Sequence, residues 1–167
     1  MIKNAVMIIA FNGFRDEEYD TPKKILEKSG TKVTTASTQT GNATGKLGMT
    51  AKVDIALKDI KVSDYDSIIF IGGPGSYDLF DDPLTQGIAR ETVKQNKILA
   101  AICAAPGILA KAGLLKGKKT TCFSGVSYLL VKNGANYTGS GLEVDGKIIT
   151  ADGPKHAKQF GEAIVAG

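Results

Sequence analysis

The stretch that decides the fold is Ile98-Leu99-Ala100-Ala101-Ile102-Cys103-Ala104-Ala105-Pro106. Its first five residues are all apolar, which is typical of a strand that is covered on both faces. After Cys103 the chain continues as an Ala- and Leu-rich helical segment over residues 104–112, which ends at Gly113. A buried strand that leads directly into a helix indicates an α/β fold.

Two other apolar runs extend this pattern along the chain. Residues 5–10 and 67–71 carry no charge and have the length of buried strands. Residues 22–28 form an amphipathic stretch of helical period that stops at Gly30, and a further strand is expected over residues 32–37. This alternation of strands and helices predicts a doubly wound, mostly parallel sheet with right-handed crossovers.

The remaining segments are predicted from their own patterns. The Gly- and Thr-rich segment 38–57 alternates only weakly, which favours short strands or a hairpin at an edge. A second amphipathic helix is expected over residues 83–95, with three apolar side chains facing inward: Leu84, Ile88 and Val93.

The C-terminal part contains a hairpin signal and a final helix. Residues 142–150 place Asp145-Gly146 between two alternating runs, which predicts a tight hairpin. The helix is expected to begin near Pro154 and to carry the apolar residues Phe160, Ala163, Ile164 and Val165. Because 167 residues lie within the usual range for one domain, we expect residues 1–167 to form a single domain.

Composition and charge argue against several classes of function. Apolar residues make up 43% and charged residues 23% of the chain, as in soluble globular proteins. The net charge of +4 comes from dispersed lysines without interleaved aromatics, so no nucleic-acid partner is expected. No run approaches the ~18 apolar residues of a membrane span, and the start leads directly into a strand rather than a signal peptide. We therefore expect a cytoplasmic protein without a membrane partner, whose two cysteines are thiols.

Cys103 is the first candidate for chemistry because it lies between a buried strand and a helix. A nucleophile at such an elbow projects from the carboxyl edge of the sheet, and its small neighbours allow a sharp turn. The amide groups and dipole at the helix start are expected to lower the pKa of the thiol. The alternative is a buried structural cysteine, since cysteine is among the most buried residue types.

Two other segments come to the same edge of the sheet. Gly72-Gly73-Pro74-Gly75 follows the strand that ends at residue 71, and its N–H groups could hold an oxyanion. The segment lacks the Gly-Lys-Ser/Thr ending of a phosphate-binding loop, and a plain turn is the alternative. Glu18 lies in an acidic run beyond the first strand. A buried carboxylate there could share a proton with the thiol, whereas an acidic loop is more commonly solvated.

The segments around Cys103 and Gly72 resemble the ThiJ/PfpI superfamily. The resemblance rests on residues 100–106 followed by an Ala/Leu helix, and on Ile69-Phe70-Ile71-Gly72-Gly73-Pro74-Gly75 upstream. Glu18 lies where the family places an acid against its nucleophile, and Gly153-Pro154 also fits the pattern. The similarity extends over nearly the whole chain.

This resemblance implies both a fold and a site. The fold would be a flavodoxin-like three-layer sandwich, a mostly parallel sheet with helices on both faces, in a homodimer or higher oligomer. Cys103 would be the nucleophile and Glu18 the proton acceptor and donor. Backbone groups of Gly72, Gly73 and Ala104 would hold the oxyanion, without a cofactor or metal.

One departure from the family concerns histidine. Peptidase-like members carry histidine directly after the nucleophile, where this chain has Ala104. Deglycase-like members carry it in a Thr-Thr-His-Pro segment, where this chain has Cys122. Cys122 is interpreted either as a resolving thiol or as a small apolar strand residue. His156, the single histidine of the chain, is either an assistant to Cys103 or a surface residue.

The leading hypothesis is therefore a cysteine-dependent enzyme for small reactive carbonyls, glyoxalase- or deglycase-like and weak because the usual histidine is missing. An alternative from another class is a redox-responsive stress sensor or chaperone-like protein with an oxidisable Cys103. An intracellular cysteine peptidase or amidase is the weaker alternative, because it depends most on the absent histidine.

Overall fold

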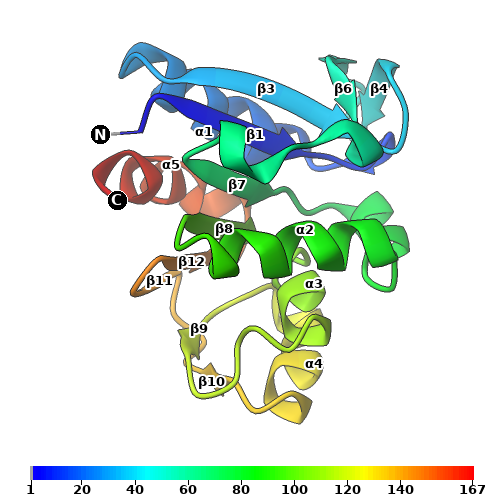
Figure 1. Cartoon of the computed structure of the whole chain (residues 1–167). Coiled ribbons are helices and arrows are strands. Elements are labelled where there is room, and N and C mark those ends of the chain that lie inside the picture. Colours follow the sequence, from blue (N-terminus) through cyan, green and yellow to red (C-terminus); the bar gives the residue numbers. More distant parts are fainter. Residues whose placement is uncertain (1) are drawn as a thin grey trace.

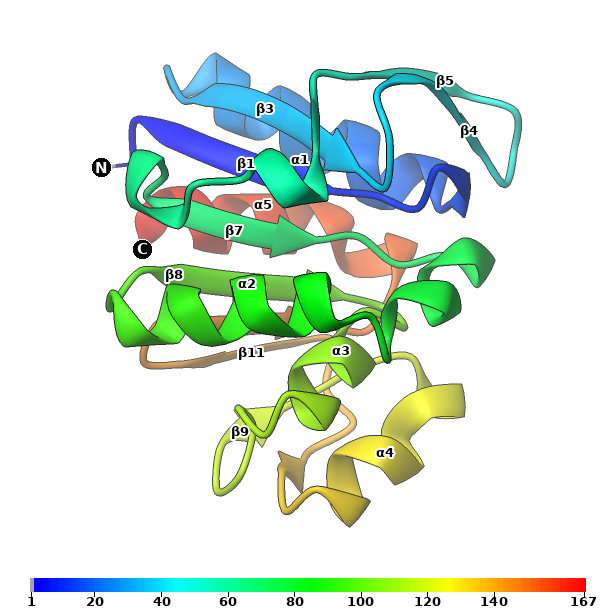
Figure 2. The ribbon, with the colours of Figure 1, turned by 45° about the vertical axis from the view of Figure 1, so that its right-hand side comes forward.

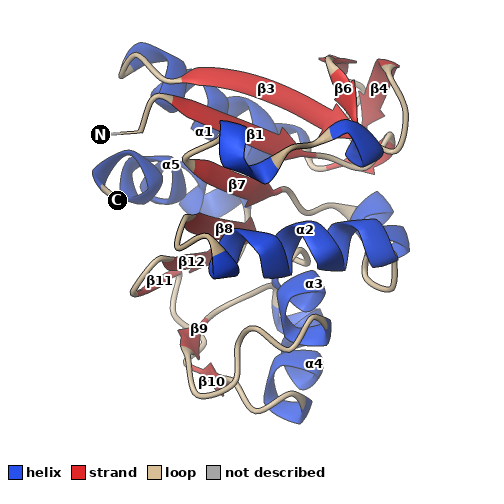
Figure 3. Ribbon diagram, viewed as in Figure 1, coloured by secondary structure: helices blue, strands red, loops and turns tan. Residues whose placement is uncertain are grey.

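A computed structural model describes residues 2–167, and its centre is a seven-stranded sheet (Figures 1 and 3). In spatial order its strands are β11 (Leu142–Asp145), β12 (Ile148–Ala151), β8 (Ile98–Ile102), β7 (Ser67–Phe70), β1 (Asn4–Ile8), β3 (Lys32–Ser37) and β6 (Ile55–Ala56). All neighbouring pairs are parallel except β11 with β12. The predicted α/β fold with a mostly parallel sheet is confirmed.

Helices cover both faces of this sheet. α1 (Asp16–Lys28) and α5 (Ala157–Ala166) pack together on one face, whereas α2 (Pro83–Lys94) and α3 (Pro106–Lys111) lie on the other (Figure 1). α4 (Ser127–Lys132) packs beside α3. Successive strand residues enter opposite cores, so that Leu99 and Ala101 face α2 while Ala100 and Ile102 face α1 and α5. The uninterrupted apolar strands thus fill both cores of a three-layer sandwich.

Helix α1 begins six residues earlier than the sequence pattern predicted. Asp16, Glu17 and Glu18 occupy its first turn, where acidic side chains interact favourably with the helix dipole. Pro22, expected at the start, lies inside the helix and cannot donate a hydrogen bond to the carbonyl of Glu18 four residues earlier. The acidic run is therefore a helix start and not a loop, which corrects the sequence-based expectation for Glu18.

The inward face of α2 also differs from the prediction. Ile88 is buried as expected, but Leu84 and Val93 are 47% and 40% exposed. The buried face of α2 consists instead of Ile88 together with Thr85, Ala89 and Thr92. The two buried threonine hydroxyls donate hydrogen bonds to backbone carbonyls, which removes the cost of burying them. The hydrophobicity of Leu84 and Val93 therefore did not identify the residues that α2 buries.

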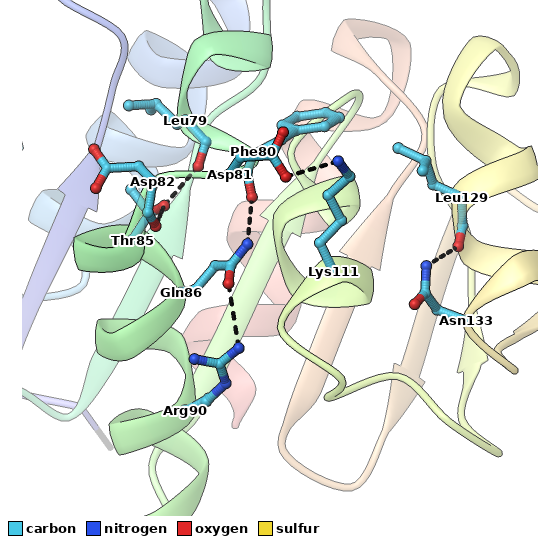
Figure 4. A network of polar contacts seen from close by, with 10 residues as sticks. All are labelled: Leu79, Phe80, Asp81, Asp82, Thr85, Gln86, Arg90, Lys111, Leu129 and Asn133. Atoms are coloured by element: carbon cyan, nitrogen blue, oxygen red, sulfur yellow. Dashed lines mark hydrogen bonds and ion pairs between the residues drawn. The ribbon is translucent and has the colours of Figure 1, made fainter.

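Polar contacts fix the segment that follows β7 against two helices. This segment is a 3-10 helix, η3 (Pro74–Leu79), and Figure 4 shows its end held by α2 and α3. Gln86 of α2 donates to the carbonyl of Phe80 at 2.7 Å, and Lys111 of α3 pairs with Asp81 at 2.7 Å. The chain that leaves η3 is thereby held between α2 and α3.

Small elements complete the chain. The predicted edge structure is the antiparallel hairpin of β4 (Gly41–Gly45) and β5 (Thr50–Val53), which forms a separate sheet with β2 (Asn12–Phe14). β9 (Lys119–Thr120) and β10 (Asn136–Tyr137) form a parallel pair, and 3-10 helices occur at η1 (Leu57–Asp59), η2 (Val62–Asp64), η4 (Ser124–Val126) and η5 (Pro154–His156). Within residues 2–167, the helices are too short or too polar to traverse a bilayer.

The β11–β12 hairpin and the final helix agree with the prediction in place but not in detail. Because Asp145 pairs with Ile148, the two turn residues are Gly146 and Lys147 rather than Asp145 and Gly146. Gly146 has a φ of +61°, a left-handed conformation that glycine adopts readily. The final helix starts as η5 and becomes α-helical at residue 157, with Phe160 and Ile164 fully buried.

The β4–β5 hairpin is attached to α1 by one carboxylate. Asp16 accepts hydrogen bonds from the backbone N–H groups of Leu47 and Met49, both at 2.9 Å. Gly45 lies against the same carboxylate, where a side chain would collide. Figure 2 shows the β4–β5 hairpin at the end of the sheet toward which the arrows of β3 and β7 point. Because Asp16 holds Leu47 and Met49, it also positions the neighbouring Lys46 at this end.

We predict that Asp16→Ala lowers the free energy of unfolding by about 2 kcal/mol, because two backbone donors lose a charged acceptor. Urea unfolding measures the loss, and hydrogen exchange should localise it to residues 45–49. Asp20→Ala is the control, since Asp20 makes only an exposed pair with Lys24 and should cost less than about 0.5 kcal/mol. Equal losses in the two variants would contradict this interpretation.

Candidate functional site

Cys103 lies at a strained elbow between β8 and α3. Its φ is +63°, in the left-handed region that non-glycine residues rarely adopt. Two hydrogen bonds hold this conformation, from the Cys103 N–H to the carbonyl of Ala151 at 2.9 Å and from the Phe123 N–H to the Cys103 carbonyl at 2.8 Å. The predicted strand-turn-helix elbow is confirmed, and strain maintained by the surrounding structure is characteristic of functional sites.

Glu18 reaches this elbow from the first turn of α1. The residue is fully buried, and its Oε1 accepts a hydrogen bond from the Gly72 N–H at 3.1 Å. The carboxyl group also interacts with the thiol of Cys103. Oε2 has no partner that meets ordinary hydrogen-bond geometry. A buried carboxyl oxygen without a fixed partner beside a thiol is a suitable acceptor for the thiol proton.

Burial raises the pKa of both groups. Burial raises the pKa of Glu18 to about 7, against smaller lowering effects from Cys103, Arg15 and Gly72. Burial and then the charge of Glu18 raise the pKa of Cys103 to about 12. The expected lowering of the thiol pKa is therefore wrong in sign, although the Ala104 and Gly73 backbone groups do act in the lowering direction. Desolvation outweighs these amide groups because the pair is buried together.

The two glycines after β7 have different roles. The N–H of Gly72 is engaged by Glu18, so its predicted place among the oxyanion donors is not supported. The backbone N–H groups of Gly73 and Ala104 instead approach the Cys103 sulfur. Gly73 has a φ of +110°, and a Cβ there would collide with the backbone at Gly13 and Arg15. Two of the three predicted donors thus lie at the reactive atom.

A pocket of about 270 Å³ opens above Cys103 and Glu18. Its other lining residues are Arg15, Lys46, Gly73, Pro74, Tyr77, Ala104, Phe123, Asp152 and Pro154. Sequence reasoning missed the charged members Arg15, Lys46 and Asp152. Asp152 could have been found, because it follows β12 at the carboxyl edge where ligands bind in such sheets. Lys46 comes from the separate hairpin sheet, for which no sequence pattern indicated a position.

Neither residue proposed as an assistant, His156 or Cys122, is part of the lining of the pocket at Cys103. His156 is absent from the pocket lining, and its Nδ1 is 2.6 Å from Oδ1 of Asp152. Cys122 is 1% exposed and belongs to the core on the α2 side, whereas Cys103 packs against the opposite core. The interpretation of Cys122 as a small apolar residue therefore fits its surroundings, and both cysteines are free thiols.

Comparison with known proteins agrees with this geometry. Residues 3–167 match the DJ-1/PfpI family. The chain belongs to the DJ-1/PfpI family. This membership confirms the resemblance seen in the sequence, and it covers nearly the full length of the chain.

Several DJ-1/PfpI relatives are similar over most of their length. A protein of Methanocaldococcus jannaschii is 39% identical over 96% of this chain and 80% of its own. A deglycase of Pyrococcus horikoshii is 30% identical over 89% and 90%, and a glutathione-independent glyoxalase of Caenorhabditis elegans is 28% identical over 98% and 87%. The crystal structure of a ThiJ/PfpI domain protein from Brachyspira murdochii superposes with a TM-score of 0.96 at 35% identity, covering 98% and 94%. The flavodoxin-like architecture expected from the family is thus confirmed.

A metal site is not evident in the described part of this DJ-1/PfpI chain. Residues 2–167 contain no group of three or more His, Cys, Asp or Glu side chains arranged to hold a metal ion. Of the described residues, only two such side chains, Glu18 and Cys103, come together at the floor of the pocket, and they interact with each other.

We predict that Gly72→Ala is destabilising by about 1–3 kcal/mol and displaces Glu18 from Cys103. A Cβ at Gly72 would lie 2.7 Å from the Cys103 Cβ, from Glu18 Oε1 and from the Ile102 carbonyl, and such overpacking is costly. Thermal or urea unfolding measures the effect. Gly87→Ala is the matched control, because nothing lies within 4 Å of its Cβ position in α2 and alanine should stabilise that helix. A neutral Gly72→Ala would contradict the close packing described here.

We also predict a pH-dependent stability difference between the parent and Glu18→Gln. The pKa of Glu18 is about 7 in the folded chain against 4.5 as a reference, so the folded state holds the extra proton between these values. Stability should consequently fall as pH rises through this window. Glu18→Gln should gain roughly 2 kcal/mol relative to the parent between pH 5 and pH 8. Urea unfolding at both pH values tests this, with the exposed Glu162→Gln as the charge-matched control, and a constant difference would contradict the raised pKa.

Proposed function

We propose that this protein is a cofactor-independent enzyme that acts on small reactive carbonyl compounds, with Cys103 as nucleophile and Glu18 as proton acceptor and donor. The observation that carries the proposal is the buried Glu18 carboxyl, with a pKa of about 7, against a thiol at a strained elbow in a pocket. Family relatives named as a deglycase and a glyoxalase support the same substrate class. The two free thiols accord with a reducing, cytoplasmic location.

The proposed reaction follows from the arrangement of these groups. The thiol of Cys103 passes its proton to Glu18 while sulfur adds to the aldehyde carbon of a 2-oxoaldehyde, which forms a hemithioacetal. The N–H groups of Gly73 and Ala104 stabilise the developing oxyanion. Glu18 returns the thiol proton to this oxyanion, which completes the hemithioacetal and leaves the carboxylate free. The carboxylate then removes the proton from the former aldehyde carbon while the neighbouring carbonyl oxygen is protonated, which gives an enediol. Return of a proton from Glu18 to the neighbouring carbon, with loss of the proton on the former aldehyde oxygen, gives the thioester, so that one carbon is oxidised as the other is reduced. Water cleaves the resulting thioester to the 2-hydroxy acid and restores the thiol.

Because the pKa of the thiol is raised, the reaction depends on Glu18 as the base. A base with a pKa near the working pH combines a substantial ionised fraction with a useful driving force for proton transfer. The histidine that assists other family members is absent, and His156 contacts Asp152 instead of Cys103. Turnover is therefore expected to be slow, and peptidase activity has the least support, because it depends most on the absent histidine.

We predict that the parent converts methylglyoxal to lactate and that Cys103→Ala abolishes the conversion. Activity requires ionised Glu18, so kcat/KM should fall about tenfold per pH unit below pH 7. Glu18→Gln should lose at least about a hundredfold at pH 7, since it removes the base. An enantioselective lactate assay over pH 5–8 measures both effects. Lactate formation that survives in Cys103→Ala would refute the proposed mechanism.

The redox-sensor alternative depends on how readily Cys103 ionises. Peroxide reacts with thiolates, and the raised pKa of Cys103 reduces the thiolate fraction at neutral pH. Partial exposure still gives Cys103 access to oxidants that the buried Cys122 lacks. These observations favour the carbonyl reaction, in which Glu18 removes the proton during attack, over rapid oxidation of the resting protein.

We further propose that the protein is a homodimer, as its family suggests. Exposed apolar side chains on several elements, including Leu47 at 61% and Val131 at 61%, would be available for such a contact. Sedimentation at micromolar concentration should give about twice the 17.5 kDa chain mass. A single species at the chain mass would count against the dimer.

A further inference from the structure

A second polar pair, Asp152 and His156, lies at the pocket outside the Cys103–Glu18 centre. Asp152 directly follows β12 and lines the pocket, while His156 ends η5 just before α5. Their side chains are 34% and 28% exposed, and Nδ1 of the imidazole is 2.6 Å from Oδ1 of the carboxylate. The mechanism proposed above uses neither residue.

Both members of this pair are held by the same piece of backbone. The Asp152 N–H donates to the carbonyl of Gly141 at 3.1 Å. The imidazole of His156 lies so close over Gly141 that a Cβ there would collide with the ring. The orientation of the carboxylate is thus fixed from two sides, by its own backbone and by the ring. Such an arrangement positions an acceptor more rigidly than a free surface carboxylate.

We propose that Asp152, oriented by His156, determines substrate specificity by accepting a hydrogen bond from a hydroxyl or ammonium group beside the reactive carbonyl. The inference rests on the proposed function and specifies its substrate class. His156 acts through Asp152 and is a positioning residue, because its ring is not part of the pocket lining.

The remaining pocket lining is consistent with a substrate larger than a three-carbon oxoaldehyde. A water molecule occupies about 30 Å³ in the liquid, so about 270 Å³ leaves room for substituents beyond the reacting carbons. Pro74 and Phe123 contribute apolar surface, whereas Tyr77 and Lys46 offer a hydroxyl and an ammonium group. The Arg15 guanidinium is engaged by Glu17 at 2.9 and 3.1 Å. Besides Glu18, the pocket lining contains one other carboxylate, that of Asp152. A carboxylate binds hydrogen-bond donors and cations.

The first test measures the charge that Asp152 presents to Cys103 and does not require turnover. Methanethiosulfonate reagents carrying a trimethylammonium or a sulfonate group modify the thiol, and peptide mass spectrometry distinguishes Cys103 from buried Cys122. Asp152→Asn should lower the ratio of ammonium to sulfonate rates about fivefold. Asp64→Asn removes the same charge from η2, which precedes β7 at the opposite, amino edge of the sheet. An effect of Asp152→Asn no larger than that of Asp64→Asn would overturn the proposal.

The second test compares methylglyoxal with its 3-hydroxy derivative. Asp152→Asn should reduce kcat/KM about tenfold for the hydroxylated substrate, mainly through KM, and less than twofold for methylglyoxal. Equal losses on both substrates would indicate a general structural role and overturn the proposal. If the parent turns over neither substrate, the proposed function fails, while the labelling ratio still decides whether Asp152 faces Cys103.

The positioning role of His156 is tested by two variants. His156→Asn retains an N–H donor near the place of Nδ1 and should preserve both the labelling ratio and the substrate preference. His156→Leu fills the space without a donor and should move both quantities toward their Asp152→Asn values. Identical behaviour of the parent and both His156 variants would overturn the positioning role.

Discussion

The contact between the buried Glu18 carboxyl and the Cys103 thiol is the constraint on which the remaining site depends. Burial disfavours the charged form of both groups; the charge of Glu18 raises the pKa of Cys103 further, whereas the hydrogen bond with Cys103 lowers the pKa of Glu18. The surrounding features allow this contact. Because Gly72 has no side chain, the thiol and the carboxyl group can approach each other, and the Gly72 N–H donates a hydrogen bond to the carboxyl. The left-handed backbone conformation of Cys103 directs the sulfur into the pocket.

This contact also accounts for how one helix and two strands of the fold meet at one point. Glu18 comes from α1 on one face, Gly72 from the end of β7 and Cys103 from the end of β8. Parallel strands bring their carboxyl ends to a common edge, so residues distant in sequence converge without long loops. On the other face of the sheet, α2 and α3 hold Phe80 and Asp81, which directly follow η3.

The sheet and the elbow could be predicted because each depends on local pattern. Strands β1, β7 and β8 are apolar on both faces, and the small residues after Cys103 indicate a tight turn. The inward face of α2 could not be predicted, because buried Thr85 and Thr92 bond to carbonyls that only the folded backbone provides. The start of α1 was misplaced since Pro22 suggested a first turn. Lys46 comes to the pocket through tertiary packing of the β4–β5 hairpin, which periodicity does not describe, whereas the position of Asp152 directly after β12 was open to prediction.

The direction of the thiol pKa shows why proximity to a helix start is an insufficient guide to reactivity. The amides of Ala104 and Gly73 do favour the thiolate, but α3 has only six residues and the sulfur is largely removed from water. Desolvation and the neighbouring carboxylate therefore dominate. A thiol of this kind is protected in the resting protein and becomes nucleophilic only as Glu18 accepts its proton. Such coupling suits the proposed reaction, in which attack and proton transfer would occur together and the state of Glu18, rather than the acidity of Cys103, would set the rate.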